Sequence, residues 1–391
     1  MTPLEVVKRP RVLMVGPFPT DPHRIDGGVS AALMYLSGAL AASGEAEILG
    51  ARIREGDDEG DDIAGFEWPV FDIALGHGSL TTLYRRQQRR LDVLIRRLRP
   101  DVLHAHGADI SGYLAVRSHV PTVVTVHGLL MACAVLQTDI VERARSMLAA
   151  ALTERGTVRR ATDLIAISPY VRFYYGADLA GRCHDIPNAV APAYFDVARR
   201  PQRGRFLFAG KISRGKGLAD LLDSVALNPS SELEVVLAGG VPDRTYEHRL
   251  RDRAKTLKLG ESVKFLGLLE ESSLLREFER ATALVLPSYQ ETAPMVVQQA
   301  MAAGLPVIAT RVGGVPHQIE HGVTGFLFEP GDTQTLAALM SQLTEDPKLS
   351  LAVGTAGKAV ALERYQAGTV ASATALVYRD IMSRSRKDAL K

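Results

Sequence analysis

Cysteine is scarce in this chain of 391 residues, which holds only Cys133 and Cys183. Two cysteines without a ligand-type spacing exclude a disulfide framework and a structural zinc site, and they fit a reducing compartment. We expect both thiols to be buried as small apolar side chains. The chain also lacks a run of about 18 uninterrupted apolar residues, the length that a membrane-spanning helix needs. The sequence therefore predicts a cytoplasmic protein that at most rests peripherally on a membrane.

No sign of charge dominates, because 46 Lys and Arg oppose 44 Asp and Glu and leave a formal net charge of +2. A global field that would attract nucleic acid is therefore missing, and we expect no nucleic-acid partner. Charge is concentrated in two places, the arginines of 85–99 and the acidic run 55–62. The acidic run is typical of a solvated loop.

The segment 85–99 predicts an amphipathic helix with a cationic outer face. Its apolar side chains recur at helical spacing opposite the arginines, at Leu91, Leu94, Ile95 and Leu98. Two interpretations stay open, a solvated surface helix or a helix that attracts anionic lipid headgroups.

Strands and helices alternate along two successive parts of the chain, which is long enough for two domains. Short β-rich runs between helical segments indicate α/β domains with parallel sheets that helices cover on both faces. In the first part, strands are expected over 11–19, 46–53, 101–107, 122–128 and 163–168, with helices over about 29–42 and 80–99. In the second part, strands are expected over 205–210, 233–240, 263–267, 283–288 and 306–310.

The stretch 185–204, rich in Pro, Ala and Arg, interrupts this alternation and is the best candidate for a linker. We predict a first Rossmann-like domain over 1–195 and a second over 196–365. A C-terminal helix is expected over 366–391, and one option is that it crosses back to the first domain. No short-period repeat occurs, which excludes a solenoid.

The distinctive turns of both parts follow the ends of predicted strands. Ligands of doubly wound sheets bind beyond the carboxyl ends of the strands. Residues at such positions are Gly16, His106, His127, Lys211, Gly239 and Glu291. Two domains of this kind placed face to face would form a central cleft.

The segment PSYQETAPMVVQQAMAAG, 287–304, is the most informative in the chain, because a polar loop runs from a strand into a short helix. The Glu291 carboxylate can accept hydrogen bonds from vicinal sugar hydroxyls. The free amides of the following helical turn favour an anion such as a phosphate. This combination is typical of a pocket for a nucleotide sugar.

The loop AGKISRGKG, 209–217, supplies Lys211, Arg214 and Lys216 between a strand and a helix, and it is typical of a diphosphate clamp. Its spacing approaches that of a P-loop, but Gly217 replaces the Ser or Thr that would hold magnesium. A tight turn with solvated lysines is the plainer alternative. The neighbouring Glu291 favours the clamp.

The turn 24–36 carries Gly27 and Gly28 directly before a helix, with Ser30 available as a cap, so its backbone amides could face an anion from the other domain. The first strand has no G-x-G-x-x-G motif, which argues against a dinucleotide dehydrogenase.

Three histidines fall on two predicted strands of the first domain. His104 and His106 share one face of a strand, and His127 ends the next strand. A further zinc ligand at a convincing spacing is missing. We interpret His104 as a hydrogen-bonded core residue. His127 is the functional candidate, because it could hydrogen-bond a hydroxyl or the backside of a reacting centre.

Together these motifs resemble the retaining glycosyltransferases of family 4, which have the GT-B fold of two Rossmann-like domains. The carriers are GGVS, DVLHAHG, TVVTVHG, IPNAV, FAGKISRGKG, VKFLG and the segment 287–332. The resemblance spans nearly the whole chain and is strongest over 205–332. It implies a hexosyltransferase-type enzyme that moves a sugar from a nucleotide diphosphate sugar to an acceptor hydroxyl, with retention, by front-face attack.

The resemblance also implies the partners of the reaction. The donor is a UDP-sugar by preference, and GDP- and ADP-sugars also fit. The acceptor is a glycan or lipid-linked molecule, as in the biosynthesis of polysaccharide, lipopolysaccharide or glycolipid. No metal and no cofactor besides the donor substrate are implied.

Carried over residue by residue, the resemblance assigns roles along the cleft. Lys211 and Lys216, with Gly27 and Gly28, hold the donor diphosphate, and His127 lies near the anomeric centre. The donor sugar is held by Glu291, Ala293, Met295 and Val296, and the nucleoside by Gly267, Leu268 and Gln299. The residues that the resemblance implies to be catalytic are His127, Glu291, Lys211 and Lys216.

One departure from the family pattern concerns the ribose. The E-x(7)-E pattern reads Glu291 and Gln299 here, so an amide stands where a second glutamate usually accepts hydrogen bonds from ribose. Gln299 keeps one acceptor, with a hydrogen bond of about 1 kcal/mol against about 1.5–3 for a charged one. Smaller departures are Ala189 and His317.

Three alternatives to an active transferase stay open. A nucleotide-sugar-binding protein that lost turnover is suggested by Gln299. A P-loop hydrolase is suggested by 209–217, and a sugar-nucleotide epimerase would share the fold without using an acceptor.

Overall fold

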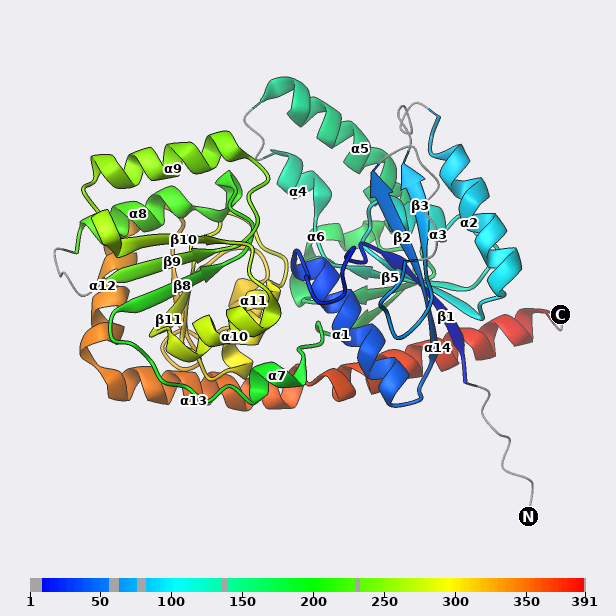
Figure 1. Cartoon of the computed structure of the whole chain (residues 1–391). Coiled ribbons are helices and arrows are strands. Elements are labelled where there is room, and N and C mark those ends of the chain that lie inside the picture. The colour runs from blue at the N-terminus through cyan, green and yellow to red at the C-terminus, as the bar shows by residue number, and fades with distance from the viewer. Residues whose placement is uncertain (1–8, 56–62, 76–81, 136–138, 229–232, 390–391) are drawn as a thin grey trace, which may run out of the picture.

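The computed structural model describes residues 9–55, 63–75, 82–135, 139–228 and 233–389. Its two α/β domains lie side by side, the N-terminal domain on the right of Figure 1 and the C-terminal domain on the left. The predicted acidic loop 55–62 falls almost entirely outside the described residues.

The N-terminal domain contains a seven-stranded parallel sheet in the order β3-β2-β1-β4-β5-β6-β7. Its strands are β1 Arg11–Gly16, β2 Glu47–Glu55, β3 Val70–Leu75, β4 Val102–His106, β5 Thr122–Val126, β6 Asp163–Ala166 and β7 Arg182–Asp185. The helices are α1 Gly28–Ala42, α2 Arg85–Leu98, α3 Ile110–Ala115, α4 Leu130–Val135, α5 Ile140–Val158 and α6 Pro169–Tyr175. Strands β4 and β5 are buried at every position, as expected for a sheet covered on both faces.

The C-terminal domain repeats this plan with a six-stranded parallel sheet in the order β10-β9-β8-β11-β12-β13. Its strands are β8 Arg205–Ala209, β9 Glu234–Ala238, β10 Val263–Gly267, β11 Ala283–Leu286, β12 Val307–Thr310 and β13 Phe326–Phe328. The helices are α7 Pro192–Phe195, α8 Leu218–Ala226, α9 Arg244–Thr256, α10 Glu271–Arg280, α11 Met295–Ala302, α12 Thr333–Glu345 and α13 Pro347–Arg364. The predicted fold class of two doubly wound parallel sheets is therefore confirmed.

Each sheet reverses its strand order once, and these two reversals position the site. The reversal lies between β1 and β4 in the first sheet and between β8 and β11 in the second. At such a switch point the loops of neighbouring strands diverge to opposite faces and leave a crevice that binds ligands. The loops that carry Gly27 and Gly28, Lys211 and Lys216, and Glu291 all follow strands at these reversals.

The last helix, α14 Ala367–Ala389, returns to the N-terminal domain. In Figure 1 it continues from α13 and runs beneath the first sheet. Val370, Ala371 and Tyr378 pack with Leu33 and Leu40 of α1 in one apolar cluster. The end of the chain thus bridges the two domains along the side away from α5.

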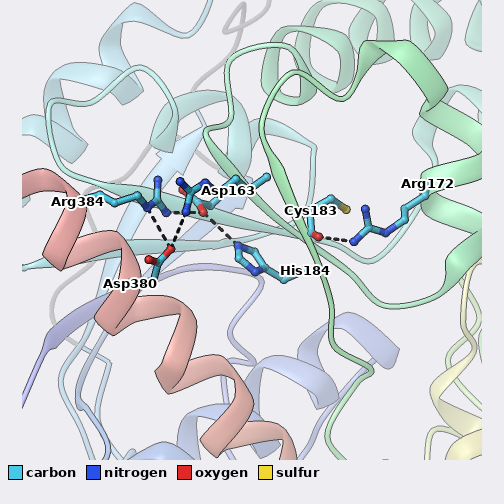
Figure 2. A network of polar contacts seen from close by, with 7 residues as sticks. Asp163, Arg172, Cys183, His184, Asp380 and Arg384 are labelled. Atoms are coloured by element: carbon cyan, nitrogen blue, oxygen red, sulfur yellow. Dashed lines mark hydrogen bonds and ion pairs between the residues drawn. The ribbon is translucent and has the colours of Figure 1, made fainter.

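A polar network fixes α14 to the edge of the first sheet (Figure 2). The fully buried Asp163 accepts a hydrogen bond from Arg384 at 2.7 Å and lies 3.1 Å from the His184 ring. Asp380, on α14, contacts Arg384 at 3.0 Å and Arg182 at 3.1 Å. Because Asp163 has no access to water, these partners are what stabilise its carboxylate.

Several predicted boundaries were wrong. Strands β3, β7 and β13 were not predicted. β7 is largely polar and β13 has only three residues, whereas β3 is an apolar run of six residues. Short apolar runs of this kind are ambiguous in a sequence. The helix predicted over 80–99 begins only at Arg85, because Leu83 and Tyr84 before it have positive φ, and it ends at Leu98. Its amphipathic pattern is confirmed, since Leu91, Ile95 and Leu98 are buried while most of its arginines are exposed.

No helix in the described ranges combines the length and apolar character needed to cross a bilayer.

Candidate active site

A cleft of about 640 Å³ lies between the two domains and is lined by residues from both. Its volume falls in the range of small-molecule and cofactor sites, about 300–1,000 Å³. Most of the lining comes from the loops after β1, β5, β8, β9, β10 and β11, with Asp109, Ile167 and Asn188 following β4, β6 and β7, so it collects the carboxyl ends of strands from both sheets. This is where two doubly wound domains are expected to hold a shared ligand.

Lys216 and Glu291 form the centre of the C-terminal wall. Lys216 Nζ lies 2.5 Å from Glu291 Oε1, and the two side chains are 27% and 10% exposed. The lysine belongs to the loop after β8 and the carboxylate to the loop after β11. A cation that suits a phosphate therefore stands beside an acceptor that suits sugar hydroxyls.

Gly217 allows this approach. Its φ is +63°, and a Cβ at this position would lie 2.0 Å from the carbonyl oxygen of Pro287. Any other residue would push the loop after β8 away from the loop after β11. Packing of the backbone thus accounts for glycine at the position where a P-loop would have Ser or Thr.

Gly27 and Gly28 extend this wall from the other domain. A Cβ on Gly27 would lie 3.6 Å from Lys211 Cε, and a Cβ on Gly28 would lie 3.3 Å from Met295 Cγ. The amides of the first turn of α1, which have no partner within the helix, therefore start next to Lys211. An anion between them would meet positive potential from both domains.

The prediction that Ser30 caps α1 was wrong. Gly27 occupies the N-cap position without a side-chain hydrogen bond, and Ser30 is buried within the first turn of the helix.

Three histidines form a stack behind the N-terminal wall. The ring centroids of His104 and His106 are 4.3 Å apart, and those of His106 and His127 are 5.2 Å apart. His106 Nδ1 lies 3.0 Å from His127 Nε2, so one of the two nitrogens donates to the other. Burial lowers the pKa of His127 to about 4, and this effect outweighs the contact with Asn188, which by itself raises the pKa. His127 therefore faces the cleft as a neutral imidazole.

His104 is the structural member of the stack, as predicted. It is fully buried, and its ring nitrogens lie 2.6 Å from the Tyr378 hydroxyl and 2.7 Å from Thr125 Oγ1. Burial lowers its pKa to about 3. Among the described residues, no set of three His, Cys, Asp or Glu side chains is grouped like the ligands of a metal.

The cleft brings together nearly all the residues singled out from the sequence. They are Gly27, Gly28, His127, Lys211, Lys216, Leu268, Glu291, Ala293, Met295, Val296 and Gln299. Gly267 does not line the cleft. It ends β10 with φ +68°, and its carbonyl accepts a hydrogen bond from the amide of Gly239 at 2.7 Å.

Sequence reasoning missed a second group of lining residues, Tyr35, Tyr194 and Glu271. They come from α1, α7 and α10, and no local motif marks them. A tyrosine inside a helical pattern and a glutamate at a helix start are both commonplace, so only the tertiary fold reveals that they meet.

The prediction that both cysteines are buried was wrong. Cys133 is exposed and lines the cleft, and Cys183 is half-buried at the edge of the first sheet. Cys133 belongs to α4, a short helix at the rim of the cleft in which only Ala134 is buried.

Comparison with known families covers most of the chain in two adjoining parts. Residues 26–194 match the model of Glycosyltransferase Family 4, and residues 194–360 match Glycosyl transferases group 1. The chain belongs to glycosyltransferase family 4. The transferase has the GT-B fold of that family, and the boundary between the two matches falls in α7, between the two sheets.

The relatives of the transferase support the same class. Glycogen synthase of Mycobacterium tuberculosis is 28% identical over 91% of this chain and 92% of its own length. D-inositol 3-phosphate glycosyltransferase of Streptomyces avermitilis is 35% identical over 46% of this chain and 40% of its own length. The chain is thus a glycosyltransferase rather than a P-loop hydrolase.

Solved structures agree on the fold. Sucrose-phosphate synthase from Thermosynechococcus elongatus aligns with a TM-score of 0.81 at 21% identity, over 96% of this chain and 100% of its own. Anabaena HepE, solved in complex with UDP and glucose, aligns with a TM-score of 0.72 at 21% identity, over 94% and 99% of the two chains.

Proposed function

We propose that the transferase moves a sugar from a nucleotide diphosphate sugar to an acceptor hydroxyl, with retention at the anomeric carbon and without a bound metal ion. One observation carries the proposal. At the cleft between the two switch points, Lys216 pairs with Glu291 while Lys211 stands against the glycine turn that starts α1. The two lysines and the Glu291 carboxylate, which would bind sugar hydroxyls, therefore lie close together in a cleft large enough for one small ligand.

The donor is proposed to lie with its diphosphate at Lys211, Lys216 and the α1 amides. Glu291 would accept hydrogen bonds from hydroxyls of the transferred sugar, with the backbone around Ala293 to Val296 beside it. The nucleoside would lie toward Leu268 and Gln299. A UDP-sugar is favoured over GDP- and ADP-sugars, with support from HepE, which has been solved with UDP-glucose as well.

The proposed chemistry takes place on one face of the sugar. The acceptor oxygen bonds to the anomeric carbon on the face from which the diphosphate leaves, and the acceptor proton passes to a departing phosphate oxygen. Lys211 and Lys216 stabilise the negative charge that develops on the diphosphate, which is the task that a metal performs elsewhere. Neutral His127 supplies a hydrogen bond near the anomeric centre, and closed domains exclude water.

The acceptor is proposed to be a glycan or a lipid-linked sugar bound on the N-terminal domain. A peripheral membrane contact would use the exposed arginines of α2. Cosedimentation with vesicles of phosphatidylglycerol and phosphatidylcholine tests this contact. Binding that grows with the anionic fraction and is lost on reversal of Arg86 and Arg89 to Glu supports it, and equal binding to neutral vesicles contradicts it.

A second candidate, a donor-binding protein with little turnover, is favoured by Gln299. This side chain is only 6% exposed and has polar contact with the Tyr194 hydroxyl, so part of its hydrogen-bonding capacity is used inside the protein. Binding of a donor without transfer to any acceptor and without hydrolysis would establish this alternative.

The test measures calorimetric binding and release of nucleoside diphosphate with UDP-, GDP- and ADP-sugars, in the presence of a chelator or of magnesium. We expect one donor class to bind and turn over equally in both conditions. Glu291→Gln should weaken sugar-dependent binding, whereas the exposed Glu363→Gln on α13 should not.

Two results would contradict the proposal. One is activity only with magnesium, which would make the lysines insufficient. The other is product with inverted anomeric configuration, which NMR of the reaction mixture detects directly.

A further inference from the structure

A hydrogen bond crosses the cleft from one domain to the other. The hydroxyl of Tyr35, on α1, donates to Oε1 of Glu271, on α10. Burial, together with the nearby Tyr194 and the Glu271 charge, raises the pKa of Tyr35 far above its ordinary value. Tyr35 therefore keeps its proton at neutral pH and serves as a permanent donor to the carboxylate.

Two further side chains, Tyr194 and Gln299, extend the contact between Tyr35 and Glu271 to α11. The rings of Tyr35 and Tyr194 are 6.4 Å apart and inclined at 61°. The Tyr194 hydroxyl has polar contacts with both Tyr35 and Gln299. Glu271 and Gln299 are thus the two ends of one polar chain that lines the cleft.

The second carboxylate oxygen of Glu271 is available to a ligand. Tyr35 occupies Oε1, and no donor among the described residues reaches Oε2. Glu271 lines the cleft three positions after Leu268, at the start of α10. A carboxylate has about four lone-pair sites, so it can accept a ligand hydroxyl while it keeps the hydrogen bond from Tyr35.

We propose that Glu271 is the carboxylate that recognises the ribose of the donor nucleoside, in place of the glutamate that is absent at position 299. The assignment rests on the proposed function, since it takes the nucleotide sugar as the ligand of this cleft. Glu271 would accept a hydrogen bond from one ribose hydroxyl while Gln299 accepts one from the other. Tyr35 acts as a positioning residue that holds the carboxylate in place from the opposite domain.

This arrangement explains how the chain tolerates Gln299. A cis-diol needs two acceptors, and replacing the second glutamate by an amide would leave only weak, uncharged ones. Glu271 restores one charge-assisted hydrogen bond from a different helix. It also ties recognition of ribose to contact between the domains, because Tyr35 and Glu271 belong to different domains.

The test compares binding of ribonucleotides with their deoxyribose counterparts. Calorimetry with UDP, GDP and ADP, each beside its 2′-deoxy and 3′-deoxy form, should show a preference of the wild type for ribose of about tenfold. Glu271→Gln should reduce this preference to about twofold or less, because the charged acceptor is lost. Tyr35→Phe should reduce it partially and leave binding of inorganic diphosphate unchanged.

Two matched variants separate recognition from general damage. Glu270→Gln changes the neighbouring exposed carboxylate, which does not line the cleft, and should keep the full preference. Gln299→Glu in the Glu271→Gln background should recover it, because a carboxylate returns to the other end of the polar chain.

The outcomes distinguish this assignment from the proposed function. Nucleotide binding with an unchanged ribose preference in a folded Glu271→Gln protein overturns the assignment alone. Failure of the wild type to bind any nucleotide overturns the proposed function and the assignment with it. Loss of the preference in Glu271→Gln, with recovery in the double variant, supports both.

Discussion

The two walls of the cleft use opposite chemistry. The C-terminal wall is charged and partly exposed, with Lys216 held against Glu291 and Lys211 nearby. On the N-terminal side, a stack of histidines (His104, His106 and His127) adds no charge next to His127, because burial lowers their pKa values. Asp26, Asp109 and the glycine turn of α1 line other parts of this side. The part formed by the histidine stack is called the neutral wall below. In the proposed function this difference becomes a division of labour, in which the lysines and the α1 amides bind the charged donor while the histidine stack adds no charge beside the reacting carbon.

The walls also differ in how the chain encodes them. The charged wall comes from two short loops, each readable as a motif after a strand. The neutral wall combines β4, β5 and, through Tyr378 behind His104, the last helix of the chain. Variants on each wall should therefore fail in different ways.

The largest effect is expected on the charged wall. Lys216→Ala should lower kcat by about 10²–10³, because a cation that stabilises charge on the leaving diphosphate is removed. The measurement is steady-state release of nucleoside diphosphate. Lys255→Ala, an exposed lysine on α9, serves as the control. A loss confined to KM would mean that the lysine binds the donor without assisting departure.

The next effect is on stability and not on activity, and it is expected at the contact of α14 with the first domain. Asp163→Asn should lower the free energy of unfolding by about 2 kcal/mol, because it removes a fully buried carboxylate that contacts Arg384 and His184, while Arg384 keeps its contact with Asp380. Urea unfolding measures the change. The exposed Asp252→Asn should have little effect. Equal stability of both variants would show that apolar packing alone holds α14.

On the neutral wall, His106→Leu should lower kcat about tenfold and leave nucleotide binding unchanged. The substitution removes the hydrogen bond between His106 and His127, one of the contacts that orient the His127 ring, while the contact with Asn188 remains. Turnover and calorimetry of the same preparation give the two numbers. Weakened nucleotide binding in this variant would contradict the division between the walls.

The last effect concerns the dependence of stability on pH and not the activity of a variant. In the folded protein the pKa of His104 is lowered to about 3 and that of His127 to about 4, whereas an ordinary histidine has a pKa of 6.5. Below about pH 6.5 the unfolded chain binds protons that the folded chain does not. The free energy of unfolding therefore falls as pH drops, by about 1.4 kcal/mol per pH unit for each such histidine.

Urea unfolding between about pH 7 and 5 measures this slope. His127→Gln should flatten it, and His119→Gln, at an exposed position, should not. An identical slope in both variants would mean that carboxylates rather than the histidine stack govern the acid sensitivity.

Much of the fold could be predicted from the sequence because buried parallel strands are continuous apolar runs that helices interrupt regularly. Among the edge strands that were not predicted, β7 (RCHD) is largely polar and β13 (FLF) is only three residues long, whereas β3 (VFDIAL) is an apolar run that periodicity alone does not assign to a strand. On the site, the loops with Lys211, Lys216 and Glu291 could be found because strand exits collect ligands. Ser30 and Cys133 were misplaced, because a cap and the burial of a thiol depend on where a helix sits against its neighbours.

The sequence by itself determined the two doubly wound domains, the family and the charged loops, because each of these is written in residues close together along the chain. Only the tertiary structure decided which groups meet across the cleft. Tyr35 and Glu271 are 236 positions apart, and His104 and Tyr378 are 274 apart. Contacts of that kind depend on the packing of two sheets and of α14, and no local pattern of residue types specifies them.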